Sequence, residues 1–131
     1  MTKYFKILLL PNLRTGMVLT FISMLIICVG TLLPLPRVVD VPGTDKWYHF
    51  LGFAALTYPL TVASRWYWLP ITVFGLLFGA LIEIIQRYMN RLGDVADFTA
   101  DAVGVLIGFL FGVGGYFLKL KIDNFEWRPK Q

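Results

Sequence analysis

Ten polar or charged side chains occur at the segment ends that meet on one side of this otherwise very apolar chain. They are Asp45, Lys46, His49, Glu83, Gln86, Arg87, Arg91, Asp94, Asp97 and Asp101. A bilayer penalises such groups, by about 2.5–3.5 kcal/mol for an Asp, Lys or Arg at the centre of an inserted helix. Their convergence on one membrane face therefore predicts a functional site there.

Two kinds of ligand fit these residue types. Lys46, Arg87 and Arg91 suit a phosphate or pyrophosphate at headgroup depth, because lysine and arginine donate charge-assisted hydrogen bonds to phosphate oxygens. A divalent cation is the second option, since imidazole nitrogens and carboxylate oxygens both ligate such ions. The residues with these groups are His49, Glu83, Asp97 and Asp101. Their spacing matches no specific metal motif, so the sequence leaves the cofactor unknown.

General acid–base catalysis is a third option, with His49 or Glu83 as the acid or base. Asp45 lies one helical turn before His49, so we expect its carboxylate to orient the imidazole ring. Serine and cysteine nucleophiles are absent from this side of the chain, which excludes triad chemistry. The catalytic candidates are His49, Glu83 and Asp97. The ligand-binding candidates are Asp45, Lys46, Gln86, Arg87, Arg91, Asp94 and Asp101.

A purely structural interpretation competes with these three. Glu83 and Arg87 are four residues apart, which predicts an ion pair along one helix. Asp94 and Asp97 would lie in the first turn of another helix, where the helix dipole stabilises anions. In this interpretation the charges hold the helix ends together and bind no ligand.

Composition and charge spacing indicate a membrane protein. The 131 residues are 57% hydrophobic and have a mean hydropathy of +0.69, which is too apolar for an ordinary soluble domain. Most of this character lies in four uncharged stretches, at 15–36, 50–64, 66–82 and 102–118. About 20 largely apolar residues cross the hydrocarbon core of a bilayer. The predicted fold is therefore an all-α membrane protein, a bundle of four transmembrane helices.

Turn residues and polar ends set the expected boundaries. The helices are expected at about 15–34, 45–64, 67–88 and 94–119, between an interfacial N-terminal arm (1–14) and a cytoplasmic tail (120–131). Pro59 is expected to kink the second helix, with Thr57 or Thr61 near the backbone groups that it frees. The single cysteine, Cys28, lies mid-span and is interpreted as an inert packing residue.

The distribution of lysine and arginine predicts the orientation. Of these 12 residues, eight lie in the N-terminal arm, the middle loop and the C-terminal tail, and four lie in the other two loops. The positive-inside rule then places both termini in the cytoplasm and the polar site on the outer face of the cytoplasmic membrane. The net charge of +4 follows from topology and anionic headgroups, so nucleic-acid binding is not indicated.

Glycines continue the polar helix faces toward the opposite side of the membrane. On the fourth expected helix Gly104, Gly108 and Gly112 follow the aspartates, and on the third Gly75 and Gly79 precede the glutamate. Glycines at this spacing let helices approach closely in lipid. We therefore expect the two glycine seams to pack the third and fourth helices against each other. The seams would also support a homo-oligomer.

Taken together, the motifs resemble those of the VanZ-like family. They are Asp45-Lys46-x-x-His49-Phe50-x-Gly52-Phe53, Glu83-x-x-Gln86, Arg91-x-x-Asp94-x-x-Asp97 and Asp101-x-x-Gly104-x-x-x-Gly108, and they cover roughly residues 16–115. The family's pattern often has asparagine where this chain has Asp101. The resemblance implies a small bacterial multi-pass membrane protein. The family's namesake is associated with low-level teicoplanin resistance, and no reaction is securely attached to the family.

Two function classes are expected from these observations. The first is an envelope protein whose outward-facing polar pocket binds an anionic lipid or cell-wall precursor headgroup and contributes to envelope function or glycopeptide tolerance. The alternative is an intramembrane hydrolase or transferase that acts on a lipid-linked phosphate through His49, Glu83 and Asp97. A transporter would need an oligomer to form a path, and no inverted repeat is evident between the two halves. The expected partners are membrane lipids and a lipid-linked cell-wall precursor.

Overall fold

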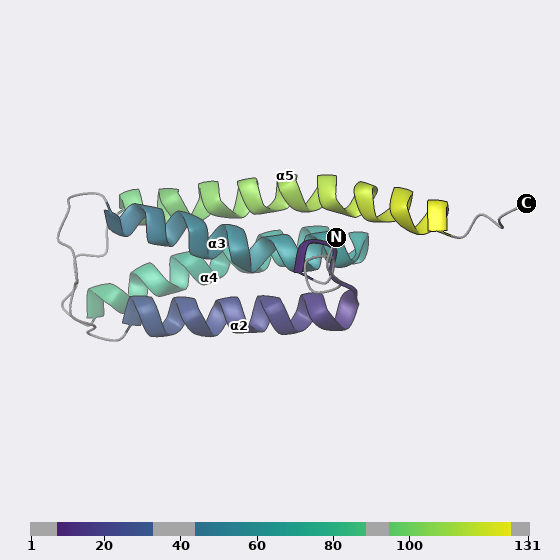
Figure 1. Ribbon diagram of the computed structural model, residues 1–131. Helices are drawn as coiled ribbons and strands as arrows, with labels where there is room; N and C mark the ends of the chain where they lie inside the picture. The colour runs from purple at the N-terminus through teal and green to yellow at the C-terminus, as the bar shows by residue number, and fades with distance from the viewer. Residues whose placement is uncertain (1–7, 33–43, 89–94, 127–131) are drawn as a thin grey trace, which may run out of the picture.

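A computed structural model describes residues 8–32, 44–88 and 95–126 of the chain. In these ranges the structure contains helices and short connections and no strand. The helices are α2 (Leu13–Leu32), α3 (Thr44–Ala63), the short 3-10 helix η1 (Arg65–Tyr67), α4 (Trp68–Tyr88) and α5 (Val95–Glu126). Figure 1 shows the four long helices side by side, with consecutive helices running in opposite directions. The prediction of an all-helical protein is confirmed.

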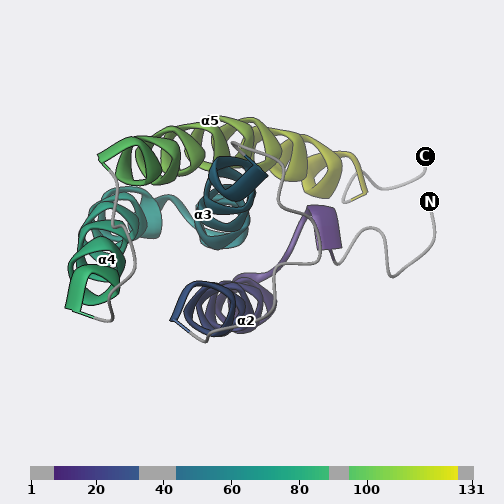
Figure 2. The same cartoon turned by 90° about the vertical axis from the view of Figure 1, so that its left-hand side faces the viewer.

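Three stretches of helix are long and apolar enough to cross a membrane. They are Leu13–Leu32, Arg65–Tyr88 and Val95–Asn124. The remaining long helix, α3, is less apolar, and it lies at the centre of the bundle with α2, α4 and α5 around it (Figure 2). Its side chains Phe53, Leu56, Thr57, Thr61 and Val62 are fully buried. Because its neighbours bury Thr57 and Thr61, these hydroxyl groups can lie on α3 without facing the hydrocarbon of a lipid bilayer.

Pro59 lies inside α3, and the structure shows how its missing hydrogen bond is replaced. A proline has no backbone N–H, so the carbonyl of Ala55 one turn earlier loses its helical donor. The hydroxyl of Ser23 on α2 donates to this carbonyl at 3.3 Å. Thr57 and Thr61 instead donate to carbonyls of their own helix. The two threonines expected near the freed groups thus bond other carbonyls, and the donor for the carbonyl of Ala55 comes from the neighbouring helix.

One of the two glycine seams packs the expected pair of helices, and the other packs a different pair. The seam of α5 faces α3, where a Cβ atom added to Gly108 would lie 2.5 Å from the carbonyl oxygen of Ala54. The seam of α4 faces α5, where a Cβ added to Gly75 would lie 2.8 Å from Cγ2 of Val105. The two seams therefore do not meet each other. The α5 seam allows close contact with the central helix, which sequence spacing alone does not identify.

Helix α5 is longer than expected and ends at Glu126 rather than near residue 119. No glycine or proline interrupts the sequence between Tyr116 and Arg128, so the backbone continues in helical form. At about 1.5 Å per residue, the 32 residues of α5 extend about 48 Å, against about 30 Å for the hydrocarbon core. The expected tail at 120–131 is thus helical up to 126. Lys119 Nζ donates to the carbonyl of Pro11 at 2.8 Å and ties this end of α5 to the N-terminal segment.

Candidate functional site

Four of the polar side chains singled out in the sequence gather at one end of the bundle, where α3 and α5 begin and α4 ends (Figure 1). They are His49, Glu83, Asp97 and Asp101, with exposed fractions of 8%, 6%, 6% and 0%. The helical repeat explains their placement, since residues three or four apart lie on one face. On α4 and α5, every residue of the expected polar face that the structure describes is buried, and this includes the glycines. The predicted convergence of these four side chains is confirmed.

The imidazole of His49 is fixed by a carboxylate from another helix. Its Nδ1 lies 2.9 Å from Oδ1 of Asp101 on α5, and the carboxylate accepts this hydrogen bond. The same nitrogen lies 3.9 Å from Oε1 of Glu83 on α4. Asp45, which we expected to orient the ring, has its side chain outside the described part of the chain. The observed orienting residue is therefore Asp101, a residue for which the sequence suggested only ligand binding.

Lys46 lies at the rim of this cluster. Its Nζ is 3.3 Å from Oδ1 of Asp97, and the lysine side chain is 43% exposed while the aspartate side chain is 9% exposed. An ion pair with a partly exposed lysine contributes little to stability in general. The lysine places a positive charge beside the buried acidic side chains, at the surface of the bundle.

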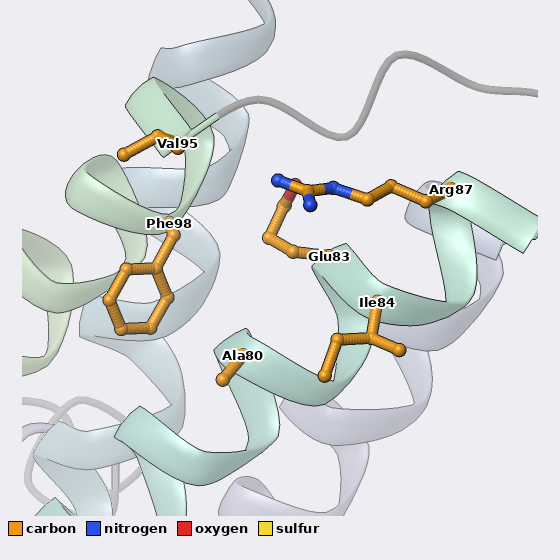
Figure 3. Close-up of a pocket in the computed structure, with 6 residues that line it drawn as sticks. All are labelled: Ala80, Glu83, Ile84, Arg87, Val95 and Phe98. Atoms are coloured by element: carbon orange, nitrogen blue, oxygen red, sulfur yellow. The ribbon is translucent and has the colours of Figure 1, made fainter.

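A groove opens beside the cluster between α4 and α5. Its volume is about 220 Å³, and the residues that line it are Ala80, Glu83, Ile84, Arg87, Val95 and Phe98. Figure 3 shows Glu83 and Arg87 extending from α4 into the same space, with Phe98 on the facing wall from α5. Glu83 belongs to both the groove and the buried cluster, so the two are continuous. The apolar wall was not among the predicted site residues, although the spacing of Ala80 and Ile84 beside Glu83 could have indicated it.

The remaining predicted residues are placed differently. Gln86 is buried and its Nε2 donates to the carbonyl of Thr31 at 3.1 Å, which joins α4 to the last turn of α2. Arg87 is exposed. Its predicted ion pair with Glu83 stays a prediction. Arg91 and Asp94 lie outside the described residues, so their predicted roles stay predictions.

The cluster has the chemical groups of a metal site or an acid–base centre. A ring nitrogen of His49 and one carboxylate oxygen from each of Glu83 and Asp97 lie within 4.8 Å of one another. All three side chains are buried, and each comes from a different helix. Oδ1 of Asp101 accepts a hydrogen bond from Nδ1 of the imidazole and so holds the ring in place, as carboxylates do for metal-binding and catalytic histidines.

No protein-family model, curated protein or solved structure matches this chain. The likeness to the VanZ-like family therefore rests on the motifs alone and stays a prediction.

Proposed function

We propose that this protein is a multi-pass protein of the bacterial cytoplasmic membrane that binds the phosphate-bearing headgroup of a lipid or lipid-linked cell-wall precursor. The groove between α4 and α5 carries the proposal, because it joins an apolar wall to Arg87 and to the buried cluster. Such a groove suits a molecule with a hydrocarbon chain and an anionic head. A role in the envelope or in glycopeptide tolerance, as in the VanZ-like family, extends this proposal and rests on the motifs.

The proposed topology has four spans, with α3 as the fourth. It is supported by the 20-residue length of α3, about 30 Å, which matches that of α2 beside it. The excess of lysine and arginine in the segments at the other end of the bundle supports cytoplasmic termini. With this orientation the cluster and the groove lie at the outer face.

Two cationic side chains are positioned to meet a phosphate. Arg87 lies on the groove and is exposed, and Lys46 is 43% exposed at the rim of the cluster. Arginine binds phosphate through two parallel N–H groups, and lysine binds it as a point charge. We therefore propose that Arg87 in the groove binds the phosphate and that Lys46 adds a second positive charge at the rim of the adjoining cluster.

Lipid binding in nanodiscs tests this proposal. The wild type is expected to prefer a polyprenyl phosphate and phosphatidylglycerol over phosphatidylcholine, measured by native mass spectrometry of retained lipid. The double variant Lys46→Gln/Arg87→Gln should lose at least about tenfold in affinity for the polyprenyl phosphate, which corresponds to about 1.4 kcal/mol. The matched control is Arg14→Gln/Lys121→Gln, which removes two exposed charges at the opposite end of the bundle. Equal retention by both double variants would refute the proposal.

An intramembrane hydrolase or transferase is the second candidate, and the 2.9 Å contact between His49 and Asp101 favours it. A carboxylate that holds an imidazole in one orientation is the usual arrangement of a histidine general base. Release of inorganic phosphate from a polyprenyl diphosphate, followed by ³¹P NMR, would test it. Wild-type turnover that disappears in His49→Gln is the expected result, and release at the rate of protein-free vesicles would exclude this activity for that substrate.

A further inference from the structure

We propose that His49, Glu83 and Asp97 bind a divalent transition-metal ion at the polar end of the bundle. One nitrogen and two carboxylate oxygens from these residues lie within 4.8 Å of one another. An ion about 2.0–2.2 Å from each ligand fits atoms separated by such distances after small side-chain adjustments. The inference deepens the proposed function, because a bound cation would give a phosphate headgroup a further point of attachment, but metal binding itself does not require the headgroup.

The three ligands come from three helices and are supported by the fold rather than by a loop. His49 is on α3, Glu83 on α4 and Asp97 on α5. Each side chain is at most 9% exposed, so each ligand atom lies in a partly dry environment at the helix ends. Helices hold metal ligands more rigidly than loops do. A single ion would therefore join the three helices where the bundle opens toward the groove.

Asp101 gives the site the outer partner that metal-binding histidines usually have. When Oδ1 of Asp101 accepts the proton of Nδ1, the neutral ring keeps its lone pair on Nε2, which is the form that ligates a metal. Because Nδ1 is also the nitrogen 3.9 Å from Oε1 of Glu83, an ion on Nε2 requires the Glu83 carboxylate to turn toward that nitrogen. The other oxygen, Oδ2, is buried and has no hydrogen-bond partner. This carboxylate is thus fully buried with only one of its oxygens hydrogen-bonded, an arrangement that costs free energy in the absence of a compensating charge. A cation bound next to His49 would supply that charge.

The mixed ligand set indicates the class of metal. Imidazole favours zinc and other transition metals, whereas carboxylates also accept manganese, magnesium and calcium. One imidazole with two carboxylates therefore favours Zn²⁺ or Mn²⁺ over Mg²⁺ and Ca²⁺, whose sites are built from oxygen ligands. Three protein ligands also leave a coordination position open, as in catalytic zinc sites. A phosphate oxygen is a suitable occupant for that position.

Lys46 provides the sharpest test because it already pairs with the Asp97 carboxylate, one of the proposed ligands. Its Nζ lies 3.3 Å from Oδ1 of Asp97, so a cation at the site must displace the lysine or share the carboxylate with it. Removal of the lysine charge should strengthen metal binding, whereas removal of a ligand should weaken it. In a purely structural ion-pair network, both substitutions would lower stability, and neither would alter the binding of a metal.

The experiment is a metal titration of the full chain in detergent micelles after treatment with a chelator. Zn²⁺ binding is measured by calorimetry, Mn²⁺ binding by loss of the free-ion EPR signal, and stoichiometry by native mass spectrometry. The wild type is expected to bind one ion. Asp101→Asn, which changes the hydrogen-bond partner of the histidine, should weaken metal binding by about 10- to 100-fold. Glu83→Gln and Asp97→Asn, which each remove a ligand, should weaken it by more than that. Lys46→Met should bind more tightly than the wild type, and Asp123→Asn, an exposed carboxylate on the same helix α5, should be unchanged.

Three outcomes would overturn the inference. They are a wild type that is helical by circular dichroism and binds neither ion, a Lys46→Met variant that weakens binding as Asp97→Asn does, and equal effects of Asp97→Asn and Asp123→Asn. If a ligand variant does not fold, the wild type and Lys46→Met still decide. Lipid retention measured with chelator present separates the two proposals. Loss of lipid preference with intact metal binding would refute only the headgroup proposal.

Discussion

His49 and Asp101 are 52 residues apart in the sequence, yet Nδ1 of His49 and Oδ1 of Asp101 are joined by a hydrogen bond of 2.9 Å. The contact links the first turns of the central helix α3 to those of α5. Both side chains are buried, so neither can exchange its partner for bulk water without a local opening of the bundle. The position of the imidazole is therefore determined by how α3 and α5 pack.

Removal of this carboxylate should destabilise the bundle. In Asp101→Ala the buried Nδ1 of His49 loses its acceptor, so we expect the free energy of unfolding to fall by about 1–3 kcal/mol. Reversible unfolding in mixed micelles of increasing SDS content, followed by circular dichroism, would measure it. Asp101→Asn should cost less, because the amide oxygen can still accept from Nδ1. A fall no larger than that of Asp123→Ala, an exposed aspartate on the same helix, would contradict the expectation.

The close contact of α5 with α3 predicts opposite effects for two glycines of one helix. A Cβ at Gly108 would lie 2.5 Å from a backbone oxygen of α3, so Gly108→Ala should force the helices apart and cost about 1–3 kcal/mol. Gly114 has no atom within 4 Å of an added Cβ. Gly114→Ala should therefore leave stability unchanged or raise it by about 0.5–1 kcal/mol through better helix propensity. The same unfolding measurement applies, and equal losses in both variants would show that this interface is not the contact described.

The hydroxyl of Ser23 should matter only while Pro59 is present. Ser23→Ala leaves the carbonyl of Ala55 without a donor and is expected to cost about 0.6 kcal/mol, the average for a hydrogen bond between membrane helices. In a Pro59→Ala background the restored backbone N–H can bond that carbonyl, so the cost of Ser23→Ala should shrink toward zero. A double-mutant cycle measures this coupling. Additive costs would mean that the serine acts independently of the proline.

The proposed orientation can be checked by the chemical accessibility of two positions on α5. Val95 and Asn124 are exposed near opposite ends of this helix. In a Cys28→Ser background, Val95→Cys should react with a membrane-impermeant maleimide in intact cells, and Asn124→Cys should react only after lysis. The reverse pattern would place the polar cluster on the cytoplasmic side.

The helices and the four buried side chains of the cluster could be predicted because both depend on spacing within one helix. The uncharged stretches identify the helices, and the three- and four-residue repeats identify which face of α4 or α5 is buried. Glu83, Asp97 and Asp101 follow directly from these repeats. His49 follows from its place in the first turns of a segment that begins at the same end.

The relative rotation of the helices could not be predicted, and the contacts between helices depend on it. Asp45 is the nearest carboxylate to His49 along the chain, but the observed partner, Asp101, is set by the packing of α5 on α3. The donor for the carbonyl freed by Pro59 comes from Ser23 on α2 for the same reason. The length of α5 was misjudged because Lys119 and Lys121 indicate the end of an apolar stretch, and a helix can continue beyond the hydrocarbon core.

The central place of α3 has a consequence for biogenesis. With α3 as the proposed second span, the translocon receives a segment that carries Lys46 and His49 near its start and is less apolar than the helices before and after it. Charged residues lower the efficiency with which a single segment enters lipid. The helices that cover most of its polar side, α4 and α5, are synthesised later. A nascent chain that ends after η1 would therefore hold α3 poorly in the bilayer, and completion of α5 would make its insertion stable.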